Sequence, residues 1–464
     1  DVMYLRTSQH PAVAALPPER LRTFDHLYQD AVDFADVYRH IAEQIVAMAE
    51  QGEDVTYAVP GHPLVGEASS ALILQRAKEK GIPVRVIAGV SFVESVLAKL
   101  AIHLDNPAEA DLLQGWQICD ALELAQAHHP PLNPDRPALI AQVYSRLIAS
   151  DVKLTLMNQY PPRHPVFIVR ETESAPRRVP LHELDHSDAF DHLTSVCVPP
   201  VSSASGFEAL QELVAHLRAP EGCPWDREQT HESLRHTLLE ETYEVLHAID
   251  TGDMRTLREE LGDLLLNVVM QVQIATEGEV FRMTDVIADV IAKLIRRHPH
   301  VFGEARAHNA EQVLAQWHAL KQRERAAATE TASALDGIAP TLPALAQAQK
   351  MAHRAEQAGF RWQTHEERLR KVREELEEVI HAQNAAHRAE EFGDLIFTIA
   401  NWADGYGVDI ETASRNANLK FARRFRRLES LVRAQGRELA DLPPEALQQL
   451  WQQAKSADDY AARP

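Results

Sequence analysis

Two patterns of apolar and polar residues divide the chain near residue 200. Before that point, short runs rich in β-branched residues alternate with stretches whose apolar residues recur every three or four positions. The predicted strands are Val55–Val59, Val84–Ala88, Ala138–Tyr144, Val166–Val169 and Ser195–Val198. The predicted helices lie near Ala35–Glu50, Glu67–Lys80 and Glu94–Leu100. This alternation predicts an α/β domain with a largely parallel sheet.

The segment Pro199–Gly206 is rich in proline and serine and is predicted to be a linker. Beyond it, apolar residues fall at helical spacing, which predicts an all-α region. A second break at Ala332–Pro340 divides this region into halves of similar size. We therefore expect a multidomain protein, with an α/β domain at residues 1–200 and two all-α domains at 206–330 and 338–464.

The two helical halves repeat five signatures in the same order. The first half carries GCPW at 222–225, EETYE at 240–244, ELGD at 260–263, KLIRR at 293–297 and WHALK at 317–321. The second half carries GFRW at 359–362, EELEE at 374–378, EFGD at 391–394, KFARR at 420–424 and WQQAK at 451–455. Such a repeat indicates an internal duplication, so each half is expected to build an equivalent site.

Each half places five carboxylates on two consecutive helices, because the spacing of EExxE and of ExxD keeps their acidic residues on one helical face. The first set is Glu240, Glu241, Glu244, Glu260 and Asp263, and the second is Glu374, Glu375, Glu378, Glu391 and Asp394. Crowded carboxylates repel one another unless a cation is present. Oxygen ligands without cysteine favour Mg²⁺ or Mn²⁺. A solvated acidic face is the alternative for a single EExxE, but the duplication favours metal sites.

Each half also carries three cations within one helical turn, namely Lys293, Arg296 and Arg297, and Lys420, Arg423 and Arg424. They are either surface charges or, beside a metal site, a phosphate clamp. Trp317 and Trp451 precede Lys321 and Lys455 by one turn. Such a tryptophan either belongs to the core or stacks on a nucleobase. Together these features predict a nucleoside triphosphate site, and the chain has no GxxxxGK[ST] loop of a P-loop enzyme.

Composition narrows the choice of partners. The 464 residues include 47 Lys and Arg against 68 Asp and Glu, a formal net charge of −21. This acidity argues against nucleic acid and anionic membranes as partners, although bound divalent cations still permit phosphorylated substrates. The sequence has three widely spaced cysteines and neither a signal peptide nor an apolar run long enough to span a membrane. A cytoplasmic protein is therefore expected.

Residues 206–460 resemble the MazG family of nucleoside triphosphate pyrophosphohydrolases through GCPWDREQT, LEETYEV, ELGDLL and RRHPHVF. The resemblance implies Mg²⁺-dependent hydrolysis of a nucleoside triphosphate, non-standard nucleotides among the candidates, to the monophosphate and diphosphate. Water would attack the α-phosphorus. It also implies a homodimer formed through the helical bundles and a preference for the second copy as the competent one.

The resemblance also implies residue roles in the second copy. Metal would be held by Glu375, Glu378, Glu391 and Asp394. Glu374 would be a further ligand or the base that activates water, so Glu374 and Glu375 are the predicted catalytic residues. The phosphates would be bound by Lys371, Lys420, Arg423 and Arg424, and Trp451 and Lys455 would close on the nucleotide. His387 and Arg388 stand where a family lysine is expected.

The N-terminal 200 residues resemble the tetrapyrrole (corrin/porphyrin) methylases through YAVPGHP at 57–63 and AGVSFVES at 88–95. These segments are similar to loops that bind S-adenosylmethionine, and Gly61 and Gly89 would allow close backbone approach, although strand-end turns would also need glycine. The family's first strand and glycine-rich loop are expected before Asp1, and His62 replaces an acidic residue, so weak or absent S-adenosylmethionine binding is expected. Two functions remain as alternatives to hydrolysis: a methyltransferase with accessory helical domains, and a non-catalytic nucleotide- or metal-binding module.

Overall fold

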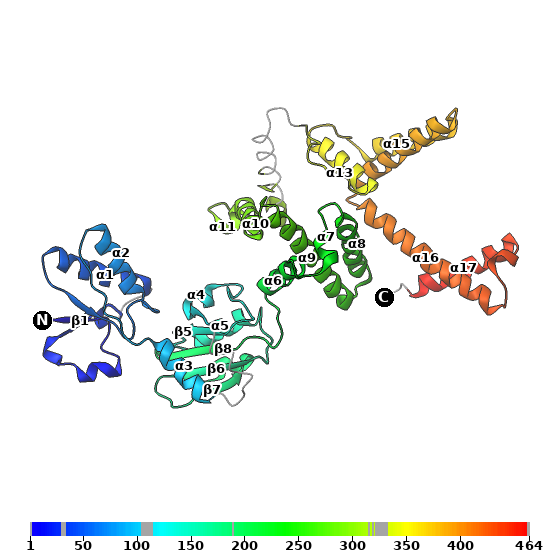
Figure 1. The fold of residues 1–464 in the computed structure, drawn as a ribbon. Helices are drawn as coiled ribbons and strands as arrows, with labels where there is room; N and C mark the ends of the chain where they lie inside the picture. The colour runs from blue at the N-terminus through cyan, green and yellow to red at the C-terminus, as the bar shows by residue number, and fades with distance from the viewer. Residues whose placement is uncertain are drawn as a thin grey trace. The chain divides into compact units, whose positions relative to one another are not determined.

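A computed structural model describes residues 2–28, 34–103, 115–187, 190–313, 316–317, 320 and 333–461 (Figure 1). The chain forms two compact units, Asp1–Val290 and Ile291–Pro464, and each is described by itself. In the described part of the chain, no helix is both long and apolar enough to cross a membrane.

The first unit begins with a small parallel sheet. Its strands are β1 (Met3–Leu5), β2 (Leu21–Thr23) and β3 (Thr56–Ala58), in the order β2-β1-β3, with Met3 opposite both Leu21 and Thr56. Short 3₁₀ helices lie at Pro11–Ala15, Pro18–Arg20 and Asp25–Tyr28. The helices α1 (Phe34–Glu50) and α2 (Ala68–Glu79) contribute Ile41, Ile45 and Ile73 to its core. The predicted helices at 35–50 and 67–80 and the predicted parallel pairing are confirmed here.

A second sheet of five strands follows. The strands β4 (Gln117–Asp120), β5 (Ala138–Ala141), β6 (Pro165–Arg170), β7 (Arg177–Pro180) and β8 (Thr194–Val198) lie in the order β4-β5-β8-β6-β7. Alternate residues point to opposite faces, so Leu139 and Phe167 pack with α3 (Phe92–His103), whereas Ile140 and Ile168 share a core with α4 (Ala121–Gln126) and α5 (Arg146–Leu156). Two helical layers therefore enclose this sheet. A 3₁₀ helix at Leu181–His186 completes the larger core.

Two predictions about this region are wrong. Only β4 and β5 pair in parallel in the second sheet, because β8 enters between β5 and β6 and runs antiparallel to both. The predicted strand Val84–Ala88 has no strand structure. Val84, Val86 and Ile87 are 48%, 42% and 71% exposed. A β-branched run forms a strand only where a neighbour completes its hydrogen bonds, and this run has no such neighbour in either sheet.

The remainder of the first unit is helical. It contains α6 (Phe207–Arg218), α7 (Pro224–Glu228), α8 (Arg235–Thr251), α9 (Met254–Glu277) and the start of α10 (Met283–Arg297). The helices α8 and α9 form a hairpin, because Gly252 adopts φ 71° after α8 and Asp253 accepts hydrogen bonds from two backbone N–H groups at the start of α9. Val214, Val269 and Met270 join α6 to α9.

The two residues directly before α6 are held by a residue of the α/β region, Asp135. Its carboxylate accepts hydrogen bonds of 2.8 Å from the backbone N–H groups of Ser205 and Gly206. A Cβ at Gly206 would lie 2.7 Å from Asp135 Oδ2 and 2.9 Å from Asn133 Oδ1, so a larger residue would force these two side chains to move. The predicted linker therefore ends in a fixed contact between the α/β region and the first helix after it.

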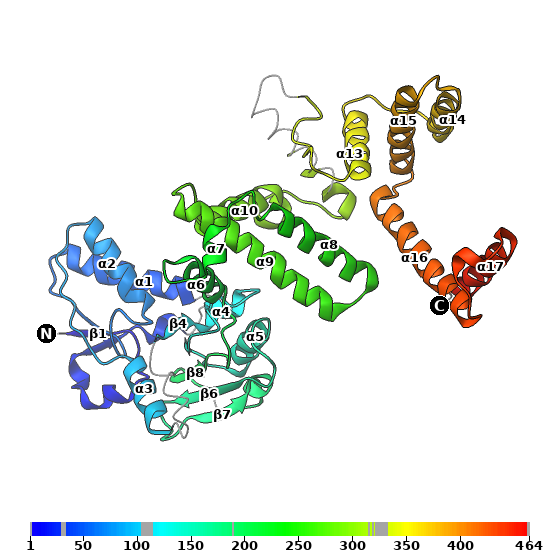
Figure 2. The same ribbon diagram turned by 45° about the vertical axis from the view of Figure 1, so that its right-hand side comes forward.

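The second unit is also helical. It contains α11 (Pro299–Phe302), α13 (Ala344–Gln357), α14 (His365–His381), α15 (Ala385–Asp404), α16 (Ile410–Ala434) and α17 (Pro444–Ala461), with a 3₁₀ turn at Leu439–Asp441. The helices α14 and α15 form a hairpin like that of α8 and α9, and α13 packs on α15. Figures 1 and 2 show α16 leading away from this hairpin, with α17 folded back along α16. The predicted all-helical character after residue 206 is thus confirmed for the described residues.

Candidate active site

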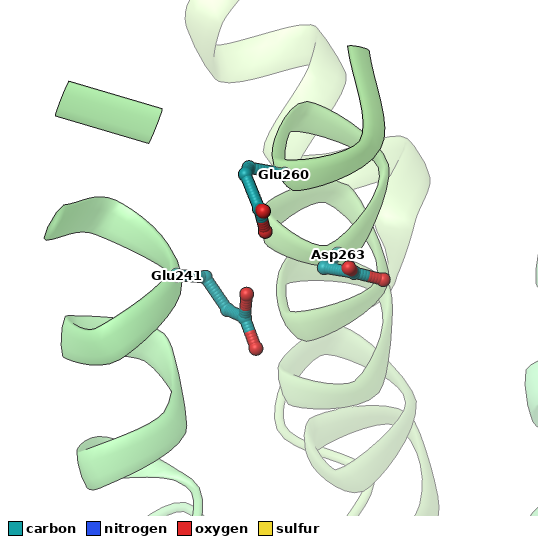
Figure 3. Close-up of side chains that lie close together, drawn as sticks. All are labelled: Glu241, Glu260 and Asp263. Atoms are coloured by element: carbon teal, nitrogen blue, oxygen red, sulfur yellow. The ribbon is translucent and has the colours of Figure 1, made fainter. Parts of the chain in front are cut away.

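The first acidic signature forms a compact trio on the α8–α9 hairpin. Glu241 extends from α8 toward α9, and Glu260 and Asp263 lie on the neighbouring turns of α9 (Figure 3). One carboxylate oxygen from each residue lies within 4.8 Å of the other two. The spacing of Glu260 and Asp263 places both on one face of α9, and the tight turn at Gly252 directs that face to α8. Three of the five predicted ligands therefore converge.

The trio is electrostatically strained. Partial desolvation raises the pKa of Glu241, and the charges of Asp263, Glu244 and Glu260 raise it further. Desolvation also raises the pKa of Glu260, with Glu244 and Asp263 as the next causes. The remaining predicted ligands, Glu240 and Glu244, are exposed and add to this field from outside the trio. A divalent cation would relieve the repulsion, and the all-oxygen donor set fits Mg²⁺ or Mn²⁺.

The second acidic signature forms a corresponding trio on the α14–α15 hairpin. Glu375 and Glu378 come from α14 and Glu391 comes from α15, again with one oxygen of each within 4.8 Å of the others. Glu375 is only 5% exposed. Asp394, the counterpart of Asp263, is exposed and lies outside the trio, whereas Glu378 takes the third place. The donor set is again all oxygen and fits the same ions.

Two basic side chains, Lys371 and His387, contact the second trio. Lys371 Nζ lies 2.8 Å from Glu374 Oε1 and 2.9 Å from Glu375 Oε1, and these hydrogen bonds raise the pKa of Lys371. His387 Nε2 lies 2.9 Å from Glu391 Oε1. Desolvation, followed by the charge of Glu375, raises the pKa of Glu378. The sequence predicted Lys371 as a phosphate ligand, and the structure places it within the acidic cluster.

The basic signatures lie on α10 and α16. Lys293 and Lys420 are both exposed. Arg296 and Arg297 follow Lys293 on α10, and Arg423 and Arg424 follow Lys420 on α16. The Arg297 guanidinium lies 5.9 Å from the centre of the Trp317 ring, so the first basic and aromatic signatures meet. Lys321, which was predicted to accompany Trp317, lies outside the described residues.

The aromatic signature of the second half lines an apolar groove between α16 and α17. Its volume is about 440 Å³, and it is lined by Phe421, Phe425, Leu428, Leu439, Leu447, Gln448 and Trp451. The Trp451 ring lies 5.5 Å from that of Phe421 and 6.0 Å from Lys455 Nζ. The two phenylalanines stack at 5.8 Å, and sequence reasoning missed them. The sequence feature that could have identified them is a pair of aromatic residues four positions apart within a basic helix.

A larger cavity of about 1060 Å³ lies in the α/β region. Gly61, with φ 79°, lines it, whereas Gly89 packs behind Gly61, because a Cβ on Gly89 would lie 2.6 Å from the Gly61 carbonyl oxygen. Arg6 and Glu67 also line the cavity, paired at 2.9 Å. Sequence reasoning missed this pair, and no sequence pattern marks it. The volume suits a ligand of the size of S-adenosylmethionine.

Comparisons with known proteins match both regions. Residues 1–175 match the family of tetrapyrrole (corrin/porphyrin) methylases. Residues 229–302, which include the first trio, match the MazG nucleotide pyrophosphohydrolase domain. The fold and the acidic hairpins thus define a class of protein in which a methylase-like α/β domain precedes a helical hydrolase region.

Three relatives identify the family. The chain is 38% identical to the uncharacterized protein YabN of Bacillus subtilis, with 99% of this chain and 94% of that protein covered. It is 43% identical to the nucleoside triphosphate pyrophosphohydrolase/pyrophosphatase MazG of Thermotoga maritima, with 54% and 97% covered. It is 45% identical to the nucleoside triphosphate pyrophosphohydrolase of Escherichia coli K12, with 53% and 96% covered. The chain belongs to the MazG family, as a member fused to a tetrapyrrole methylase domain.

Proposed function

We propose that the helical region hydrolyses nucleoside triphosphates to nucleoside monophosphates and diphosphate with Mg²⁺ as the cofactor. The main support is the duplicated trio of carboxylate oxygens, each within 4.8 Å, on hairpins that are built in the same way. The names of the Thermotoga and Escherichia relatives support the same reaction. We further propose that residues 206–330 and 338–464 are two MazG domains and that residues 1–200 are the methylase-like domain.

In the second copy, Glu375, Glu378 and Glu391 would hold the metal, with Asp394 completing the set. Mg²⁺ would supply Lewis-acid stabilisation of the charge on the phosphates. Glu374 is exposed beside the trio and can accept a proton from the attacking water. In the first copy, Glu241, Glu260 and Asp263 would take the same positions, with Glu240 and Glu244 at the edge.

The substrate would be held by the basic and aromatic signatures. Lys420, Arg423 and Arg424 on α16 supply the positive charge that a triphosphate needs in a chain with a net charge of −21. By the sequence repeat, Lys293, Arg296 and Arg297 on α10 are the counterparts of these three cations. Trp451 offers an aromatic face with Lys455 beside it, a combination that suits a base next to a phosphate.

We also propose that the chain acts as a homodimer. Apolar side chains flank the acidic trio on the second hairpin, where Leu376 and Ile380 on α14 are 47% and 60% exposed and Phe392 and Ile396 on α15 are 49% and 46% exposed. Such a patch is typical of a surface that is covered by another protein. A second copy packed on this hairpin would bury these residues beside the carboxylates.

The test is a panel of nucleoside triphosphates assayed for diphosphate release with Mg²⁺, with Mn²⁺ and with excess chelator. Diphosphate and monophosphate as the first products, only with a divalent cation, are expected. Orthophosphate and a nucleoside diphosphate as the first products would contradict the proposed bond cleavage. Full turnover in excess chelator would contradict the metal requirement.

A second candidate function is methyl transfer by the α/β region, which is favoured by the cavity of about 1060 Å³ and the family match over residues 1–175. Glu67, the buried acid of this cavity, is already engaged by Arg6 and by the hydroxyl of Ser69. Weak or absent S-adenosylmethionine binding, expected from the sequence, stays a prediction. Tight stoichiometric binding in calorimetry, together with transfer of a labelled methyl group, would refute this expectation.

A further inference from the structure

The two acidic hairpins differ at two equivalent positions. Three residues before EELEE stands Lys371, whereas three residues before EETYE stands Thr237. Four residues before Glu391 stands His387, whereas four residues before Glu260 stands Thr256. The second copy therefore carries two basic side chains where the first carries two threonines.

Both basic residues contact the carboxylates of the second trio. The Lys371 ammonium lies 2.9 Å from the buried carboxylate of Glu375. The Lys371 side chain is 32% exposed, so the ion pair is partly shielded from water. His387 contacts Glu391 from the same helix at 2.9 Å. The extra carboxylate of this copy, Glu377, does not offset them, because it is 66% exposed and lies 3.7 Å from His381. The second trio thus has an internal counter-ion.

The first trio has none within its own unit. Among the described residues of Asp1–Val290, no lysine or arginine forms an ion pair with Glu241, Glu260 or Asp263. His236 lies 3.6 Å from Glu240, outside the trio, and both side chains are largely exposed. The Thr256 hydroxyl donates to Asp253 at the start of α9 instead. Within the described residues of this unit, no lysine or arginine side chain therefore balances the negative charge of the trio.

We propose that the two copies are inequivalent cation sites: the first trio binds a divalent ion at lower concentration, and the second binds one only by displacing Lys371 from Glu375. This proposal rests on the proposed function, which assigns both trios to metal. A divalent ion that enters the second trio must break the Lys371 pair, which has no counterpart in the first. The apparent affinity of the second trio for metal is therefore reduced by the fraction of molecules in which Lys371 is displaced from Glu375.

The displaced ammonium has a defined next partner. Lys371 lies three and four residues from Glu374 and Glu375 on one face of α14, so it stays at the site after it leaves the carboxylates. A phosphate group next to the incoming cation would accept its hydrogen bonds. Metal and substrate would therefore bind cooperatively in the second copy. The Lys371 ammonium would donate hydrogen bonds first to the carboxylates and, after metal binds, to the phosphate.

The test measures Mn²⁺ binding to the full chain by the electron paramagnetic resonance signal of free Mn²⁺, after removal of bound metal. The wild-type chain should show two classes of site, with Glu241→Gln removing the tighter class and Glu375→Gln the weaker. A matched exchange then follows. Lys371→Met should tighten the weaker class by about tenfold or more, because no ion pair then competes with the metal, and Thr237→Lys should weaken the tighter class by a similar factor. Circular dichroism checks folding, and Lys371→Gln replaces Lys371→Met if the latter unfolds.

A nucleotide whose α and β phosphates are joined by a methylene group should tighten the weaker class in the wild-type chain, and less so in Lys371→Met. Two equal classes, or a weaker class that Lys371→Met loosens further, would overturn the proposal while leaving both metal sites in place. Absence of saturable Mn²⁺ binding in every variant would overturn it together with the metal assignment beneath it.

Discussion

Removing one carboxylate from each trio should rank the two copies as catalysts. Glu375 and Glu241 are counterparts on α14 and α8, and each has an oxygen within 4.8 Å of two other carboxylates. Replacement by glutamine keeps the side-chain volume, which matters because Glu375 is 5% exposed and an alanine there would open a cavity and leave Lys371 without its buried partner. The pair Glu375→Gln and Glu241→Gln therefore isolates the loss of charge.

We expect Glu375→Gln to lower kcat/KM at least 100-fold, which corresponds to about 2.7 kcal/mol of transition-state stabilisation. The loss combines a weakened metal site with a misplaced Lys371. Glu241→Gln should lower kcat/KM less than about tenfold, partly through stability, because the family resemblance implies that the second copy is the competent one. Diphosphate release at saturating Mg²⁺ is the assay, and circular dichroism confirms folding. The ranking would be reversed if Glu241→Gln were inactive while Glu375→Gln kept nearly wild-type activity. Equal partial losses of activity in the two variants would mean that both copies turn over.

Three other predictions concern substrate binding and stability. Phe421→Ala should raise KM for nucleotides with little change in kcat, since it removes the ring beside Trp451; an unchanged KM would exclude the groove as a base site. Asp135→Ala should lower the free energy of unfolding by about 1–2 kcal/mol in thermal denaturation, because the backbone N–H groups of Ser205 and Gly206, directly before α6, lose their acceptor; no change would refute this role. Burial would raise the pKa of Asp185, but hydrogen bonds from Lys153 and Ser150 outweigh it and hold the pKa below 3.8. The ion pair between Asp185 and Lys153 therefore stabilises the fold above pH 3.8, and this stabilisation is lost as the pH falls below that value. The difference in stability between the wild type and Asp185→Asn should accordingly shrink from pH 7 to pH 3.

Helical periodicity and residue spacing predicted the hairpins but not which carboxylates meet. Glu260 and Asp263 both reach the first trio, yet in the second copy Glu378 replaces Asp394. Spacing defines a helix face, whereas the rotation of two packed helices and their side-chain rotamers decide which atoms converge. Lys371 also shows what spacing leaves undecided. It was predicted to bind phosphate, but its distance of four residues from Glu375 also permits the ion pair that the structure contains.

In the α/β region, the long elements were predictable and the short ones were not. The strands β1 and β2 have three residues each, too few to show an alternating pattern. The segment Val84–Ala88 has the β-branched residues typical of a strand, yet it lies outside both sheets. Strand pairing depends on distant partners, such as β8 between β5 and β6, and a local pattern cannot contain them.

The contact between Asp135 and α6 has a consequence for how this fusion can be divided. The preceding domain supplies the carboxylate that accepts from the backbone N–H groups of Ser205 and Gly206, the two residues directly before α6. A gene fragment that starts at the linker would encode a chain in which these two N–H groups lose this acceptor. Recombination that exchanges the N-terminal domain would keep this contact only if it carried over an acidic residue at the position of Asp135.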